Sequence, residues 1–209
     1  MNAHHKQIRR TALVAATAVA ALVLAACGGG GHDMGSTESG SSSAATTAPA
    51  KAGDHNAADV AFSTEMIQHH RQAVEMAELA ATRASSTETK DLATKIKGAQ
   101  DPEIKTMSGW LTSWGEEVPA DMSGMGHDMS SAMPGMMSTD DMDKLGKAKG
   151  AEFDKAFAEM MIKHHEGAIE MAKTEKAEGE YAPAKRLADD VIRAQTAEIE
   201  QMNKMLGKI

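Results

Sequence analysis

The 209-residue chain contains a single cysteine, Cys27, and its aromatic residues are limited to three Phe, two Trp and one Tyr. One cysteine cannot form an internal disulfide framework, so a folded domain must be held together by its core. Because aromatic rings are scarce, that core must be built from aliphatic side chains and from an unusual number of methionines, 17 in the whole chain.

Basic side chains are also in short supply, with 22 Lys and Arg against 30 Asp and Glu, which gives a formal net charge of −8. A surface of this sign repels phosphate backbones, so no nucleic acid is expected as a partner. Long apolar runs are missing too, apart from residues 11–24. The sequence therefore indicates membrane contact only at its N-terminus.

This N-terminus has the pattern of an export signal. A basic start precedes the apolar run, which closes with Leu-Ala-Ala-Cys ending at Cys27 and predicts a signal peptide over residues 1–26. The last four residues resemble the bacterial lipobox, in which the cysteine becomes the lipidated first residue. We therefore expect an exported lipoprotein anchored through Cys27 to the outer face of the cytoplasmic membrane. Residues 27–56, rich in Gly, Ser, Thr and Ala, are expected to form a disordered tether.

Two parts of the chain are copies of each other. The region 57–115 recurs in the region 149–209 at a constant offset and without a gap. The repeated residues include Phe62, Met66, Ile67, His69, His70, Ala73, Glu75, Met76 and Ala77, which return as Phe157, Met161, Ile162, His164, His165, Ala168, Glu170, Met171 and Ala172. A fold made of two copies tends to place equivalent residues around a pseudo-two-fold axis, and here those residues include a His-His pair in each copy.

Each copy has the pattern of a helical hairpin. Apolar residues in 57–84 recur at the three- and four-residue spacing of a helix that faces a bundle. Ser85 and Glu88 are typical of a capping box that opens a second helix, and Gly115 is a suitable stop. The sequence predicts an all-α fold, an antiparallel four-helix bundle made of the two tandem hairpins, joined by a Met-rich linker over 116–148. A dimer that exchanges hairpins is the alternative.

The paired histidines are candidate metal ligands. Adjacent side chains on a helix diverge by about 100°, so His69 and His70 are poorly placed to chelate one ion, and ligands are expected from more than one helix. His69 and His164 continue the apolar seam and are expected to be the inner ligands, with His70 and His165 at the flank. The alternative is a hydrogen-bonded polar layer that sets the register of the bundle, with methionines filling gaps.

Carboxylates recur on the helices that face these histidines. Glu103 and Glu198 lie beside Gln100 and Gln195 on otherwise apolar stripes. A buried carboxylate needs a partner. It could fix the tautomer of an imidazole by accepting its N–H, or it could bind the metal itself. Both roles remain open from the sequence.

The linker carries methionines without the helical apolar face that core packing would require. Thioethers suit Cu(I) and, by the same softness, Ag(I), so this segment predicts an accessory metal loop. A scavenger of oxidants and a partner-binding surface are the alternatives. The residues of the accessory loop are Met122, Met125, His127, Met129, Met133, Met136 and Met137.

The motif Met-x-x-His-His followed by Ala-x-Glu-Met-Ala, and the later Ala-Gln-x-x-Glu-Ile-x-x-Met, resemble the domain-of-unknown-function family 305 over residues 57–209. The resemblance implies a ferritin-like four-helix domain from an exported bacterial protein, and some Met- and His-rich relatives are associated with copper binding and copper tolerance. The metal-site positions that it singles out are Met66, His69, His70, Met76, Glu103, Met107, Met161, His164, His165, Met171, Glu198 and Met202.

Taken together, the patterns favour an extracytoplasmic, lipid-anchored protein that binds copper for metal buffering, tolerance or transfer. A copper ion is the only cofactor expected, and a copper-transfer protein or a second copy of the chain is the expected kind of protein partner. An enzyme is less favoured, since di-iron bundles place a Glu three residues before a His, where this chain has Met66 and Met161. A ferritin-like metal-dependent oxidase, a haem protein and a structural or partner-binding bundle are the alternatives.

Overall fold

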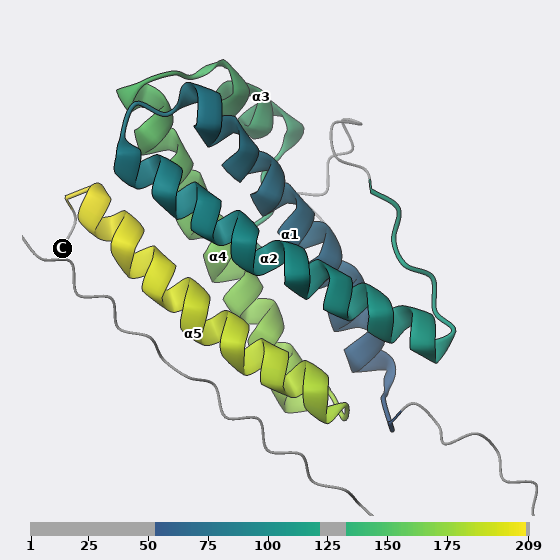
Figure 1. The fold of residues 1–209 in the computed structure, drawn as a ribbon. Helices are drawn as coiled ribbons and strands as arrows, with labels where there is room; N and C mark the ends of the chain where they lie inside the picture. The colour runs from purple at the N-terminus through teal and green to yellow at the C-terminus, as the bar shows by residue number, and fades with distance from the viewer. Residues whose placement is uncertain (1–52, 122–132, 208–209) are drawn as a thin grey trace, which may run out of the picture. The chain divides into compact units, whose positions relative to one another are not determined.

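The computed structural model describes residues 53–121 and 133–207. Its helices are α1 (Ala57–Arg83), α2 (Thr87–Trp114), α3 (Thr139–Lys147), α4 (Ala151–Glu178) and α5 (Ala182–Met205) (Figure 1). The all-α prediction is confirmed, and the short α3 lies within the range expected to be a linker. No helix in the two described ranges is both long and apolar enough to cross a membrane. The predicted signal peptide, Cys27 and the tether up to residue 52 lie outside the described residues.

The ends of α2 follow from local hydrogen bonds. The side chain of Ser86 caps the helix by accepting a hydrogen bond from the backbone N–H of Thr89. The prediction of a capping box at Ser85 was wrong by one residue, because the Ser85 hydroxyl instead donates to Asp154 of α4. At the other end Gly115 adopts a left-handed conformation with φ of 80°, which favours glycine and stops the helix as predicted.

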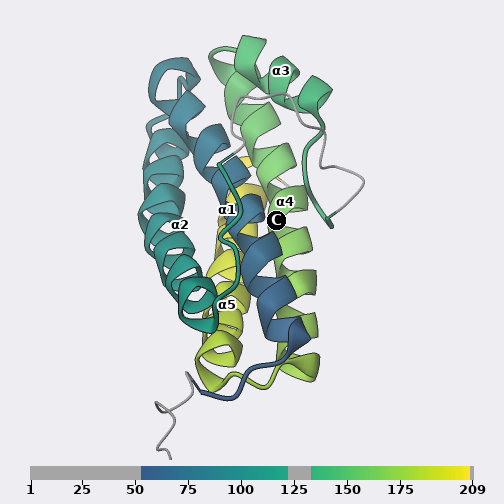
Figure 2. The ribbon, with the colours of Figure 1, turned by 90° about the vertical axis from the view of Figure 1, so that its right-hand side faces the viewer.

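The four long helices form two hairpins that meet along one seam. α1 packs along α2 and α4 along α5, so each sequence repeat is one antiparallel hairpin. The hairpins join mainly through α1 and α4, whereas α2 and α5 have little contact with each other. Figure 2 shows α1 lying between α2 and α4. The predicted four-helix bundle is confirmed, and its centre is the interface between α1 and α4.

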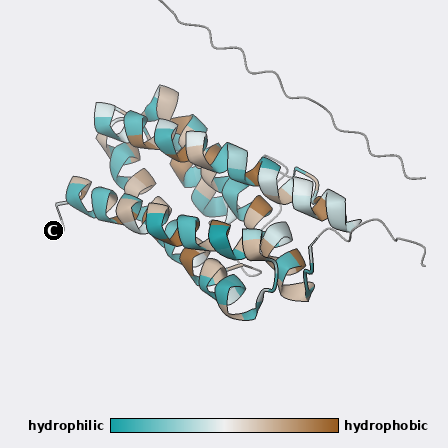
Figure 3. Cartoon of the chain, turned by 60° about the horizontal axis from the view of Figure 1, so that its bottom comes forward, coloured by the Kyte–Doolittle hydropathy of each residue, from teal (hydrophilic) through white to brown (hydrophobic). Residues whose placement is uncertain are grey.

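The core consists of two apolar clusters that the repeat relates to each other. The first cluster contains Met66, Met107 and Met171, and the second contains their equivalents Met161, Met202 and Met76. Each cluster therefore takes methionines from both hairpins. Figure 3 shows the apolar residues as separate bands on largely hydrophilic helices, as expected when each helix buries one face.

The segment between α2 and α4 covers part of the bundle. Met133, Met136 and Met137 are buried, and Met137 belongs to the second apolar cluster together with Leu145 of α3. The expectation that core packing poorly explains the linker methionines is therefore wrong for these three, because the chain folds back onto the bundle. The other predicted members of the accessory loop, Met122, Met125, His127 and Met129, lie outside the described residues.

Candidate metal centre

Four histidines meet at the centre of the bundle. His69 and His70 on α1 and His164 and His165 on α4 are all fully buried. The ring centroids of His69 and His164 lie 3.8 Å apart with an interplanar angle of 42°, and those of His164 and His165 lie 6.5 Å apart. The His pairs of the two repeats therefore form one layer across the seam between α1 and α4.

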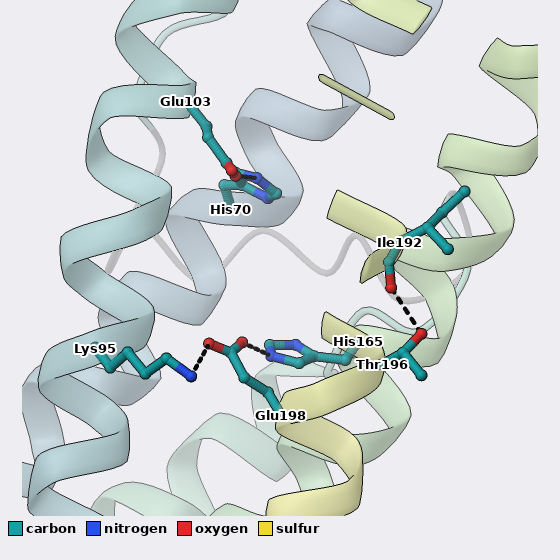
Figure 4. A network of polar contacts seen from close by, with 7 residues as sticks. All are labelled: His70, Lys95, Glu103, His165, Ile192, Thr196 and Glu198. Carbon is teal, nitrogen blue, oxygen red and sulfur yellow. Dashed lines mark hydrogen bonds and ion pairs between the residues drawn. The ribbon is translucent and has the colours of Figure 1, made fainter. Parts of the chain in front are cut away.

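The outer helices supply a carboxylate to one histidine of each pair (Figure 4). Nε2 of His70 lies 2.7 Å from Oε2 of Glu103 on α2, and Nε2 of His165 lies 2.9 Å from Oε2 of Glu198 on α5. Glu198 also has Nζ of Lys95 3.7 Å from its other carboxylate oxygen. Glu103 and Glu198 thus hold the His70 and His165 rings in place, as expected for carboxylates beside metal-binding imidazoles.

His69 is held by backbone instead. Its Nε2 lies 3.1 Å from the carbonyl oxygen of Pro134, in the segment that precedes α3. A carbonyl oxygen only accepts, so Nε2 of His69 carries the hydrogen. With one proton on Nε2, the Nδ1 atom of the neutral ring has a free lone pair.

Burial favours the neutral form of His69, His164 and His165. Burial and then the neighbouring His70 lower the pKa of His69 to about 3, and burial followed by His69 lowers the pKa of His164 well below its usual value. Burial also lowers the pKa of His165, although Glu198 acts in the opposite direction. Neutral imidazole is the form that binds metal ions, and here it is present across the physiological pH range.

The layer contains ring nitrogens that no group in the described residues satisfies. They are Nδ1 of His69, Nδ1 of His70, Nδ1 of His165, and both ring nitrogens of His164. Buried polar atoms without a partner are rare and costly. A proton on Nδ1 of His70 or His165 would bury an N–H donor without an acceptor, so these nitrogens also present lone pairs. The His layer is therefore a set of unused nitrogen donors shielded from water.

Methionines precede and follow the His pair along each of the two central helices. Along α1 the histidines separate Met66 from Met76, which belong to different apolar clusters, and the repeat places Met161 and Met171 in the same way on α4. These four methionines, and Met107 and Met202 from the outer helices, are buried. Buried sulfur donors thus lie on the same helices as the histidines and on the two helices packed against them, although every one of these methionines also fills the core.

The histidines and carboxylates of the described residues do not form a ready-made site with three or more ligands. Within residues 53–121 and 133–207, no three side chains from His, Cys, Asp and Glu are grouped so that they could hold one metal ion. An ion bound in the His layer would therefore draw on few nitrogen donors and on neighbouring sulfurs. Soft monovalent ions such as Cu(I) and Ag(I) suit that mixture of donors.

Sequence reasoning missed the segment that touches His69. The amide of Gln72 on α1 hydrogen-bonds the backbone of Met137 in both directions, at 2.9 Å and 2.7 Å. Gly167 on α4 lies so close to Pro134 that an added Cβ would be 2.1 Å from its carbonyl oxygen. A signal for these contacts existed, because Gln72 and Gly167 are equivalent positions at which the two otherwise similar repeats differ.

The family of the chain follows from comparison with known proteins. The model of the family described as a domain of unknown function, DUF305, matches residues 59–206. The chain therefore belongs to the DUF305 family. No match to it is found among the curated proteins.

Several solved structures resemble this one. A DUF305 protein from Streptomyces coelicolor, described as secreted, is 32% identical with a TM-score of 0.65, over 72% of this chain and 93% of that chain. A DUF305 fragment from Deinococcus radiodurans is 27% identical with a TM-score of 0.64, over 74% and 98%. CopM in the Cu(I)-bound form is 36% identical with a TM-score of 0.59, over 70% and 94%, and CopM is also known in Cu(II)-bound and Ag-bound forms.

Proposed function

We propose that this DUF305 protein is an exported copper-binding protein that holds Cu(I) in the His layer, and that it accepts Ag(I) in the same place. The observation that carries the proposal is the layer of four buried histidines, each with at least one ring nitrogen that has no partner in the described residues, in a bundle whose core also contains buried thioethers. The similarity to CopM, crystallised with copper and with silver, supports the choice of metal.

The donor chemistry favours the reduced ion. Neutral imidazole and thioether are soft to intermediate ligands, and the layer excludes the water molecules that a divalent ion would retain. Glu103 and Glu198 orient the His70 and His165 rings, which raises the basicity of the opposite nitrogens. We assign ligand roles to the histidines and to the adjoining methionines, while both carboxylates act by positioning. Metal binding requires only these donors, and the proposal assigns no group to a catalytic step. We therefore favour buffering or transfer of copper over catalysis.

Titration with Cu(I) under anaerobic conditions, against a competing chromophoric ligand, tests the proposal. The double variant His69→Gln and His164→Gln should lose most of the affinity, and Met66→Leu with Met161→Leu should weaken it while preserving core volume. His55 is a suitable control for substitution with Gln, since its ring stacks on Trp114 at 4.4 Å and lies outside the layer. Absence of saturable binding by the unmodified protein, or equal binding by all variants, would refute the assignment.

We further propose that Cys27 carries a lipid that anchors the protein at the outer face of the cytoplasmic membrane. The support is the Leu-Ala-Ala-Cys sequence after an apolar run and the description of the Streptomyces relative as secreted. Replacement of Cys27 by Ser should release the protein from the membrane fraction of expressing bacteria and abolish incorporation of labelled fatty acid. Unchanged fractionation would remove the anchor from the proposal without affecting copper binding.

A further inference from the structure

The segment 133–138, here called the strap, lies against the His layer and is fixed there by contacts with both central helices. Pro134 accepts a hydrogen bond from Nε2 of His69 at 3.1 Å, and the side-chain amide of Gln72 pairs with the backbone N–H and C=O of Met137. All three strap methionines are buried. The strap is therefore a packed part of the bundle that touches the centre directly.

Two glycines allow the strap to approach α4 this closely. Gly135 has φ of 75°, and a Cβ there would lie 2.6 Å from the carbonyl oxygen of Lys163. At Gly167 a Cβ would lie 2.1 Å from the oxygen and 2.4 Å from the carbonyl carbon of Pro134. None of these distances is compatible with a side chain at Gly135 or Gly167. The contact between strap and α4 is thus made backbone to backbone and tolerates only glycine.

The repeat departs from symmetry where it meets the strap. Gln72 of the first copy holds Met137, whereas its equivalent in the second copy, Gly167, leaves the space that Pro134 occupies. A side chain as long as Gln at position 167 would block the strap, and a Gly at position 72 would leave Met137 unclamped. The residue at each of these two equivalent positions therefore allows the strap to pack against the central helices.

We infer that the strap is a positioning element of the metal centre: the Pro134 carbonyl fixes His69 with its hydrogen on Nε2, so that Nδ1 is the nitrogen offered to the metal. This inference rests on the proposed copper binding. Glu103 and Glu198 do the same for His70 and His165 by accepting from Nε2. His69, His70 and His165 are therefore all held through Nε2, by the Pro134 carbonyl, Glu103 and Glu198 respectively. Nδ1 is left without a partner on each of these three rings.

His164 is the exception to this pattern. It is the equivalent of His69, but neither of its ring nitrogens has a partner in the described residues. The strap hydrogen-bonds the ring of His69 but not that of His164, so the two facing rings are held differently. His69 is anchored in one tautomer, whereas no hydrogen-bond partner in the described residues selects one nitrogen of His164.

The test uses the variant Gly167→Ala, which forces the strap away from α4 but favours helix formation at that position, since Ala is a better helix former than Gly by about 1 kcal/mol. Gln72→Ala releases Met137 without a steric clash and serves if the first variant fails to fold. Gly109→Ala is the matched control, because this helical glycine has no atom within 4 Å of an added Cβ. Each protein is titrated with Cu(I), and the His69 tautomer is read from long-range ¹H–¹⁵N correlation spectra of the metal-free form.

In the unmodified protein His69 should show the Nε2–H tautomer. In Gly167→Ala and Gln72→Ala this signature should be lost, with a fall in Cu(I) affinity of about 10–100-fold, whereas Gly109→Ala should retain both. If the unmodified protein binds Cu(I) and both strap variants bind equally well, the strap has no positioning role and the inference is overturned, while the proposed function stands. If the unmodified protein does not bind Cu(I), the proposed function fails and the inference fails with it.

Discussion

Glu175 gives the sharpest prediction of stability, because it is a buried carboxyl group next to another one. It is 1% exposed, and neither of its oxygens has a donor partner in the described residues. Beside it lies Asp59, also fully buried, whose carboxylate accepts from the backbone N–H groups of Asn56, Glu180 and Tyr181. Asp59 thereby ties the start of α1 to the turn between α4 and α5.

The two carboxyl groups titrate in opposite directions. Burial raises the pKa of Glu175 from 4.5 to about 8, together with the neighbouring carboxylate of Asp59, whose negative charge disfavours ionisation of Glu175. Burial is the largest single influence and acts to raise the pKa of Asp59, but the backbone hydrogen bonds from Asn56, Tyr181 and Glu180 and the Glu175 side chain together leave that pKa lowered. Asp59 thus stays ionised at neutral pH, and Glu175 stays protonated and able to donate to it.

The sign of the effect on stability follows from linkage. At a pH below the pKa of Glu175 in the unfolded chain, both states bind its proton, so the titration of Glu175 does not affect the free energy of unfolding. As the pH rises toward 8, the unfolded chain releases this proton while the folded protein keeps it. The free energy of unfolding therefore falls over this pH range. At about 1.4 kcal/mol per pKa unit, the loss between pH 5 and pH 8 is on the order of 3–5 kcal/mol. Asp59 contributes in the other direction only at more acidic pH, where its stabilisation is lost.

Glu175→Gln removes the titration and keeps a donor for Asp59. The free energies of unfolding of the variant and the unmodified protein, measured by urea denaturation from pH 5 to pH 8, should diverge, with the variant the more stable at pH 8 by on the order of 3–5 kcal/mol. Comparing the two proteins cancels the buried histidines, whose lowered pKa values make folding less favourable as pH falls. Glu178→Gln, at an exposed position of the same helix, is the control. Parallel curves for Glu175→Gln and the unmodified protein would refute the reasoning.

Two further predictions concern the metal centre. Glu198→Gln should reduce Cu(I) affinity by about 10–100-fold, which is more than the loss expected for Glu103→Gln. The reason is that the Glu198 side chain is 4% exposed, whereas the Glu103 side chain is 20% exposed. Competitive titration measures both affinities, and equal losses would contradict the prediction. Cu(I) at 100 times its dissociation constant should stabilise the native protein by about 2.7 kcal/mol, seen as a higher Tm that the double variant of His69 and His164 does not show.

The fold could be predicted from the sequence because the relevant signals are local and repeated. The helix stripes of 57–84 and their copy required only residue spacing, and Gly115 marked the end of α2 correctly. The start of that helix was misplaced because Ser85 and Ser86 are both good caps, and the choice between them depends on Asp154 of the other hairpin. Such a contact between distant residues leaves no mark on local spacing.

The sequence predicted which residues form the His layer, but not how their rings are held. The apolar seam indicated that His69 and His164 would be the inner pair, and their ring centroids lie 3.8 Å apart. His70 and His165, expected at the flank, are equally buried. The repeat could not show that Pro134 would fix the tautomer of His69, because the strap belongs to the unrepeated linker. The pair of Asp59 and Glu175 was equally hidden, since the equivalent of Glu175 in the first repeat is Ala80. Features that break the repeat are thus the ones that spacing cannot foresee.

His165 has a carboxylate partner and His164 has none in the described residues, and this difference allows a test between a metal centre and a purely structural polar layer. Replacing His164 by Leu removes two buried nitrogens without partners in the described residues and adds no new ligand, so the metal-free protein should gain about 1–3 kcal/mol. Replacing His165 by Leu leaves the buried carboxylate of Glu198 without its imidazole partner, so the protein should lose about 3–5 kcal/mol. A layer built for stability would lose from both changes. Opposite signs in urea denaturation, with weaker Cu(I) binding in both variants, would therefore mean that His164 is retained for its ligand nitrogens at the expense of stability. Equal destabilisation by both substitutions would instead favour the structural layer.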